Sequence, residues 1–177
     1  DEYEPMLWAI FDCCIPTISA VNGMAAGAGA NLALAADVVI ASETASFSQA
    51  FSRIGLIPDA GGTYWLPRQI GMARAMGTAL FAEPVSASKA AEWGMIWEAV
   101  PDANFQAVVK ARAQQLANGP TEGYRLTKKA MRASIDHTLE KQLQTEARLQ
   151  GKAGRTSDFK EGVMAFLEKR KPQFEGR

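Results

Sequence analysis

Short apolar runs alternate with glycine- or proline-containing breaks over the first hundred residues, which predicts strands and helices in turn. Continuous apolar or β-branched runs predict buried strands over 17–21, 37–41, 45–48 and 95–100. Apolar residues at helical spacing predict helices over 5–14, 32–36, 63–71 and 72–81, and a short helix that Ser86 caps and Gly94 ends. This alternation is typical of an α/β fold.

Beyond Pro101 the chain becomes charged and poor in glycine, and the pattern predicts helices over 103–118, 121–136, 138–151 and 156–170. The last helix has an apolar face, which covers its own core or a neighbouring subunit. We expect residues 1–101 to form an α/β core and residues 102–177 a helical region of the same domain.

The composition narrows the possible classes of protein. Nineteen basic residues balance nineteen acidic ones, so we expect neither nucleic acid nor a membrane as partner. Adjacent Cys13 and Cys14 and the single His137 offer no metal-ligand spacing, and we expect reduced thiols in a cytoplasmic protein without a metal. His137 has no Gly-x-Ser-x-Gly partner for nucleophilic catalysis. The chain begins at Asp1 rather than Met, which suggests a processed or truncated piece.

A glycine loop over 27–32 is the first candidate for chemistry. It nearly matches a dinucleotide-binding fingerprint, but Leu32 stands where the third glycine would pack helix against strand. The first amides of a helix are unpaired, and they suit an anion or a carbonyl oxygen that becomes one. Tight packing of small residues explains the loop equally well, and local sequence leaves both interpretations open.

The loop before the helix at Thr63 holds the second candidate, Asp59. Its side chain could cap the helix by accepting from the amides of Gly61 or Gly62. Alternatively, it is a carboxylate beside an apolar pocket that accepts and returns protons. Nothing in the neighbouring sequence decides between them.

Several segments together resemble one family, the crotonase (enoyl-CoA hydratase/isomerase) superfamily. The resemblance covers almost the whole chain, through residues 16–23, 26–29, 32–37, 55–62, 86–95 and 161–172. It implies the latter part of a ββα spiral core, followed by a helical trimerisation region. It also implies an acyl-CoA thioester as substrate, no tightly bound cofactor, and assembly as a homotrimer or hexamer. Family members have a further N-terminal stretch, without counterpart here, that supplies one of two amides around the thioester carbonyl.

The resemblance also assigns roles to particular residues. It makes the backbone N–H of Ala28 the remaining donor to the thioester carbonyl and Asp59 the catalytic acid/base. Substrate-binding positions are then Gly27, Gly29, Asn31, Phe51 and Pro58. Lys169 and Lys171 are candidate contacts to the CoA phosphates.

Two departures from the family pattern bear on the reaction. The glutamates with which hydratases add water correspond to Asn31 and Phe51, and neither side chain transfers a proton. Asp59 stands where isomerase and dehalogenase branches have an acidic catalyst. We therefore expect an acyl-CoA isomerase. Residues 50–52, 73–77 and 93–97 most resemble the branch that converts the ring-1,2-epoxide of phenylacetyl-CoA to the oxepin in phenylacetate degradation. The alternatives are an enoyl-CoA hydratase of fatty-acid β-oxidation and a non-catalytic acyl-CoA-binding subunit; a nucleotide-binding module fits least because of Leu32.

Overall fold

The computed structural model describes residues 3–177, and their contacts define two compact units. The first contains Thr17–Ala111 and the helix that precedes them; the second contains Arg112–Arg177 and Cys14–Pro16. The boundary between these units falls inside helix α5 (Phe105–Ala117), ten residues beyond the division that the sequence pattern suggested.

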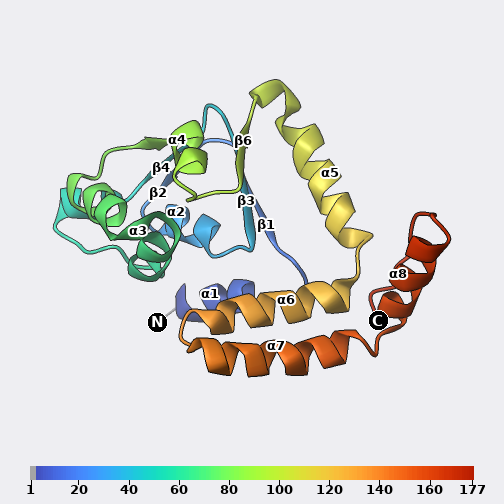
Figure 1. Ribbon diagram of the computed structural model, residues 1–177. Coiled ribbons are helices and arrows are strands. Elements are labelled where there is room, and N and C mark those ends of the chain that lie inside the picture. The colour runs from blue at the N-terminus through green and yellow to red at the C-terminus, as the bar shows by residue number, and fades with distance from the viewer. Residues whose placement is uncertain (1–2) are drawn as a thin grey trace. The chain divides into compact units, whose positions relative to one another are not determined.

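Two small sheets form the centre of the first unit (Figure 1). The parallel sheet has the order β1-β3-β6, with strands Ile18–Val21, Val38–Ser42 and Glu98–Val100. In the other sheet β4 pairs in parallel with β2 and antiparallel with β5, and the strands are Met24–Ala26, Ser46–Ser48 and Val85–Ser86. The expected α/β class is therefore found.

The helices of the first unit follow the breaks that the sequence predicted. They are α1 (Tyr3–Phe11), α2 (Ala28–Leu34), α3 (Gly62–Phe81) and α4 (Ala87–Glu92), with 3-10 turns η1 (Ala50–Ile54) and η2 (Asp102–Asn104). The break at Gly71 is confirmed, because its φ of 76° is not helical. Ser86 caps α4 through its side chain, which accepts from Lys89 N, and Gly94 follows with a φ of 79°.

One prediction in this region is wrong. The helix predicted over 32–36 is α2, which begins four residues earlier at Ala28, and Met24–Ala26 before it is a strand. Met-Ala-Ala has little intrinsic preference for a strand, so its pairing with β4 decides the conformation. Helix α2 therefore begins at Ala28, the residue whose N–H the resemblance makes a donor to the thioester carbonyl.

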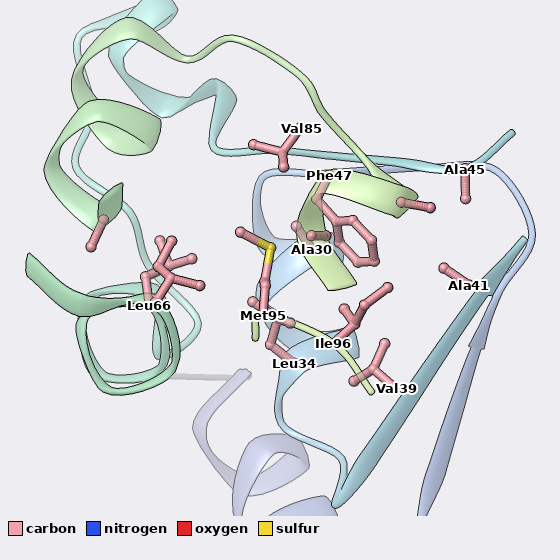
Figure 2. Close-up of a cluster of buried hydrophobic side chains, with 14 residues drawn as sticks. Ala30, Leu34, Val39, Ala41, Ala45, Phe47, Leu66, Val85, Met95 and Ile96 are labelled. Carbon is pink, nitrogen blue, oxygen red and sulfur yellow. The ribbon is translucent and has the colours of Figure 1, made fainter. Parts of the chain in front are cut away.

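The core of the first unit gathers side chains from both sheets and from α2 and α3 (Figure 2). Phe47 of β4 and Leu34 of α2 are each only 2% exposed, as is Leu66 of α3. Met95 and Ile96 close the cluster from the segment before β6. Burial of such side chains stabilises the fold by about 1.5–3 kcal/mol each. Because α2 contributes Ala30 and Leu34, its first turn is held against the sheets.

Three predicted helices of the second unit are found as α6 (Thr121–Ser134), α7 (Leu139–Ala153) and α8 (Ser157–Leu167). Helices α6 and α7 lie side by side, and Gln142 Nε2 donates to Ala130 O across them at 3.1 Å (Figure 1). Thr138 and Thr156 cap α7 and α8 with side-chain oxygens. His137 shares a side-chain hydrogen bond with Gln142 of α7 at the turn between α6 and α7.

After α8 the chain folds back and is held by two carboxylates. Buried Asp158 accepts from the amides of Glu175 and Gly176 at 2.7 and 2.9 Å. Glu161 accepts two bonds from the Arg170 guanidinium, at 2.5 and 2.8 Å, and one from the Gln173 amide at 2.7 Å. These bonds, that from Arg170 above all, lower the pKa of Glu161 to about 2 from its ordinary 4.5.

Glu161→Gln removes the charge that orders this segment, and we expect faster amide hydrogen exchange at Gln173 at pH 7. A carboxylate with a lowered pKa stabilises the fold above its ordinary pKa of 4.5, and this contribution disappears as the pH falls through about 2. The difference in protection between wild type and variant should therefore shrink over that range. Equal protection of Gln173 in both proteins at pH 7 would contradict this, and Glu140→Gln, an exposed carboxylate of α7, is the control.

Candidate active site

The corner between β2 and α2 requires glycine at position 27. Gly27 has a φ of 55° and a ψ of −129°, a conformation that other residues adopt only with strain. Its N–H donates to Ser48 O at 2.8 Å, which ties the corner to β4. A Cβ here would lie 3.6 Å from Cζ of Phe51, so this ring covers the corner from η1. Phe51 is 7% exposed, and its ring forms part of the wall beneath the glycine loop.

The two amides that follow Gly27 remain available. Ala30 N and Asn31 N donate back to Gly27 O at 3.1 and 3.3 Å, as in an ordinary first helical turn. Within residues 3–177 the N–H groups of Ala28 and Gly29 have no such acceptor. Ala28 is half-buried and Gly29 is exposed. The loop therefore presents unpaired backbone N–H groups from which an oxygen of a ligand can accept hydrogen bonds.

One turn further along α2, the carboxamide of Asn31 connects three segments of the chain. Its Nδ2 donates to Gln49 Oε1 at 3.2 Å and to the backbone O of Asp59 at 2.8 Å. Its Oδ1 accepts from Gln49 Nε2 at 2.7 Å. The Asn31 and Gln49 side chains are 0% and 2% exposed, and together they form a buried amide pair. All the amide hydrogens of Asn31 are thus used within the protein.

Sequence reasoning missed Gln49. Its only local signal is a polar side chain between Phe47-Ser48 and Ala50-Phe51, which is a weak one. The contact with Asn31 spans 18 residues and exists only because β4 and α2 pack together.

The loop that carries Asp59 is held through its backbone. Asp59 O also accepts from Gly62 N at 2.8 Å, and Ala60 O accepts from Trp65 Nε1 at 3.3 Å. The N-cap of α3 is Gly61, and no side chain caps it. The capping role considered for the Asp59 side chain is therefore wrong, because its carbonyl and not its carboxylate receives the Gly62 amide.

The Asp59 carboxylate itself is exposed and has no hydrogen bond or ion pair with any described residue. Half-buried Pro58 precedes it, and the apolar side chains of Leu56 and Ile57, which come before Pro58, are 58% and 78% exposed. An unpaired carboxylate beside apolar side chains can accept a proton from a ligand and return it.

The two lysines predicted to contact CoA phosphates belong to the second unit. Lys169 and Lys171 are exposed on either side of Arg170, whose guanidinium is taken by Glu161 and Glu168. Cavities of about 540 and 530 Å³ also lie in this unit. The first is lined by Asp158, Glu161 and Arg170 among others, and the second by residues between Gly123 and Ala153. Neither lining includes the glycine loop or Asp59, so neither cavity is the candidate site.

Between Tyr3 and Arg177 no group of three or more His, Cys, Asp and Glu side chains could hold a metal ion. Over the same span, no helix has the length and apolarity needed to cross a membrane.

Comparison with known proteins identifies relatives along the whole chain. A profile described as "Enoyl-CoA hydratase/isomerase" matches residues 1–177. The "Probable enoyl-CoA hydratase" of Rhodobacter capsulatus is 62% identical over 177 residues, which are 100% of this chain and 69% of that protein. The "1,2-epoxyphenylacetyl-CoA isomerase" of Escherichia coli K12 is 50% identical over 175 residues, or 99% of this chain and 67% of that protein.

The structure of this chain is also similar to a solved structure. The crystal structure of enoyl-CoA hydratase from Bacillus anthracis superposes with a TM-score of 0.94 at 34% identity, covering 99% of this chain and 68% of that one. The chain thus spans about two thirds of the length of these proteins.

The close approach of α3 to Asn31 predicts the effect of a small substitution. A Cβ at Gly62 would lie 2.3 Å from Asn31 Nδ2, so Gly62→Ala should cost about 1–3 kcal/mol in free energy of unfolding. Gly77→Ala is the matched control, because it lies in the same helix with open space and should be neutral or stabilise the fold. Urea unfolding measures the stability of both variants. Equal stability of the two would contradict the close approach of Gly62 to Asn31.

Proposed function

We propose that this chain, which belongs to the enoyl-CoA hydratase/isomerase family of the crotonase superfamily, acts as an acyl-CoA isomerase of the ring-1,2-epoxyphenylacetyl-CoA type. The α/β fold with a helical C-terminal region is that of its solved relatives. The family acts on CoA thioesters, generally without a tightly bound cofactor.

One observation supports this function above the others. The bond from Asn31 Nδ2 to Asp59 O joins the Asp59 loop to α2 one turn after Ala28, about 4.5 Å along the helix axis. An unpaired carboxylate and an unpaired backbone donor are thereby attached to the same short helix. An isomerase that works through an enolate needs these two groups: one to move a proton and one to hold the negative oxygen.

In the proposed reaction the thioester carbonyl accepts a hydrogen bond from Ala28 N–H. Removal of a proton from the carbon beside that carbonyl places negative charge on its oxygen, where the donor already points. A donor of this kind is worth about 3–4 kcal/mol of transition-state stabilisation in other enzymes.

Asp59 takes the proton from that carbon and delivers it to another carbon of the same enolate. The proton is only relocated, so no water is consumed and the carboxylate ends as it began. One carboxylate is enough for this cycle. As the electrons of the enolate shift into the ring, the carbon–carbon bond shared by the epoxide and the six-membered ring breaks and both carbon–oxygen bonds remain. Return of the proton to a ring carbon then completes the seven-membered oxepin.

Substrate binding is proposed for the residues around these two groups. Gly27 and Gly29 allow close approach of the thioester to the backbone, and Pro58 adds an apolar contact beside Asp59. Asn31 and Phe51, both buried, support this surface from beneath. Lys169 and Lys171 remain proposed contacts of the CoA phosphates.

The exposed apolar side chains of α8 favour assembly with further copies, and we propose a trimer or hexamer. These side chains, all between 41% and 82% exposed, are Phe159, Val163, Phe166 and Leu167.

An enoyl-CoA hydratase is the second candidate, and the name of the Rhodobacter capsulatus relative favours it. Hydration requires a group that deprotonates water, and usually a proton donor. Asn31 has a neutral amide whose hydrogens are already donated, and Phe51 has no titratable group. Asp59 would then have to act alone on water.

A parallel product assay on the natural full-length protein tests the assignment of Asp59. Offered a ring-1,2-epoxide, a 3-enoyl and a 2-enoyl CoA thioester, the wild type should isomerise the epoxide fastest. Asp59→Asn should lower that rate by about 10²–10⁴-fold, because the amide cannot accept the proton. Glu83→Gln, an exposed carboxylate after α3, should leave it unchanged. Turnover by Asp59→Asn near the wild-type rate would refute the role, and fast hydration of the 2-enoyl thioester would favour the second candidate.

A further inference from the structure

We propose that Gln49 is a positioning residue of this site: its side-chain amide locks the orientation of Asn31, which in turn fixes the place of the Asp59 carboxylate. The inference rests on the proposed role of Asp59 and adds a residue that does not touch the substrate.

The orientation of Asn31 follows from which atoms of the two side-chain amides donate and which accept. Gln49 Oε1 accepts from Asn31 Nδ2 at 3.2 Å, and Gln49 Nε2 donates to Asn31 Oδ1 at 2.7 Å. A carboxamide turned by 180° would place oxygen against oxygen and nitrogen against nitrogen in this pair. It would also turn Asn31 Oδ1 toward the carbonyl of Asp59, where two acceptors repel. With Gln49 present, only the orientation that donates to Asp59 O satisfies every group.

Burial of both side chains strengthens the preference for this orientation of Asn31. Asn31 is 0% and Gln49 2% exposed, so bulk water does not replace a lost partner. A buried polar group left without a partner destabilises the arrangement that leaves it so. Loss of the Gln49 amide therefore leaves Asn31 Oδ1 unpaired and removes the penalty against the turned orientation.

The loop that Asn31 holds contains unfavourable backbone angles and depends on such support. Ala60 has a φ of 47°, which non-glycine residues adopt only where their surroundings impose it. The imposing bonds are those from Asn31 Nδ2 and Gly62 N to Asp59 O and from Trp65 Nε1 to Ala60 O. Without the first bond, Ala60 can relax and move the neighbouring carboxylate. Proton transfer requires approach within about 2.6–3.2 Å, and a displacement of about 1 Å can cost 100-fold in rate.

Steady-state kinetics of Gln49→Met in the natural full-length protein provide the first test. The thioether fills the space without an amide, and we expect kcat to fall about 10- to 100-fold while KM changes little. Ser48→Ala is the matched control: Ser48 is also buried, 5% exposed, but its hydroxyl donates to Ala82 O, away from the Asp59 loop. A kcat of Gln49→Met within about twofold of this control would overturn the proposal.

A double variant separates positioning from general destabilisation. If Gln49 acts through Asn31, Gln49→Met combined with Asn31→Leu should have the same kcat as Asn31→Leu alone. Independent losses that multiply would overturn the proposal. Should Gln49→Met fail to fold, Gln49→Leu is the second variant, because its side chain also occupies the space without an amide. The same expectations then apply.

Hydrogen exchange gives a readout that is independent of activity. Gly62 N–H donates to Asp59 O, so its exchange should be faster in Gln49→Met than in Ser48→Ala. Unchanged exchange would overturn the proposal even if Asp59→Asn is inactive and the proposed function stands. Conversely, active Asp59→Asn would defeat the proposed function, while faster Gly62 exchange would still establish the link from Gln49 to the loop.

Discussion

The hydrogen bond from Asn31 Nδ2 to the carbonyl of Asp59 is the interaction on which the candidate site depends. It joins a short helix to a loop 28 residues further along the chain, and it is 2.8 Å long. On one side of it lies the unpaired amide of Ala28, and on the other the unpaired carboxylate of Asp59. Neither group has a partner of its own within the described chain that would hold it near the other.

The surroundings of this bond are made of backbone and small residues rather than charge. Gly27 turns the chain into α2, and Gly62 brings α3 so near to Asn31 that a methyl group would collide with its amide. The chain as a whole has no net charge. Stabilisation of a negative oxygen by a fixed amide fits this setting, because such a donor is already oriented before the charge develops.

Local sequence predicted those features of the fold that depend on a few neighbouring residues. The break at Gly71 and the cap at Ser86 follow from what glycine and serine do in any chain. The strand Met24–Ala26 could not be predicted in this way, since its conformation comes from pairing with β4.

The same distinction applies to the candidate site. The glycine loop and Asp59 were separate candidates, each with a structural alternative. Only the resemblance to a family favoured the functional interpretation of each and named Ala28 within the loop. Gln49 could not be predicted from its weak local signal, because a buried amide is meaningful only beside its partner. Its contact with Asn31, and through Asn31 with Asp59, arises from packing among α2, β4 and the loop before α3.

A crystal structure of the natural full-length protein with an unreactive CoA thioester of an arylacetic acid would test the site most directly. We expect the thioester oxygen about 2.7–3.1 Å from Ala28 N. The Asp59 carboxylate should then lie about 3–3.5 Å from the carbon beside that carbonyl. A thioester bound with its oxygen away from Ala28, or with its acyl group out of reach of Asp59, would contradict the assignment of both groups.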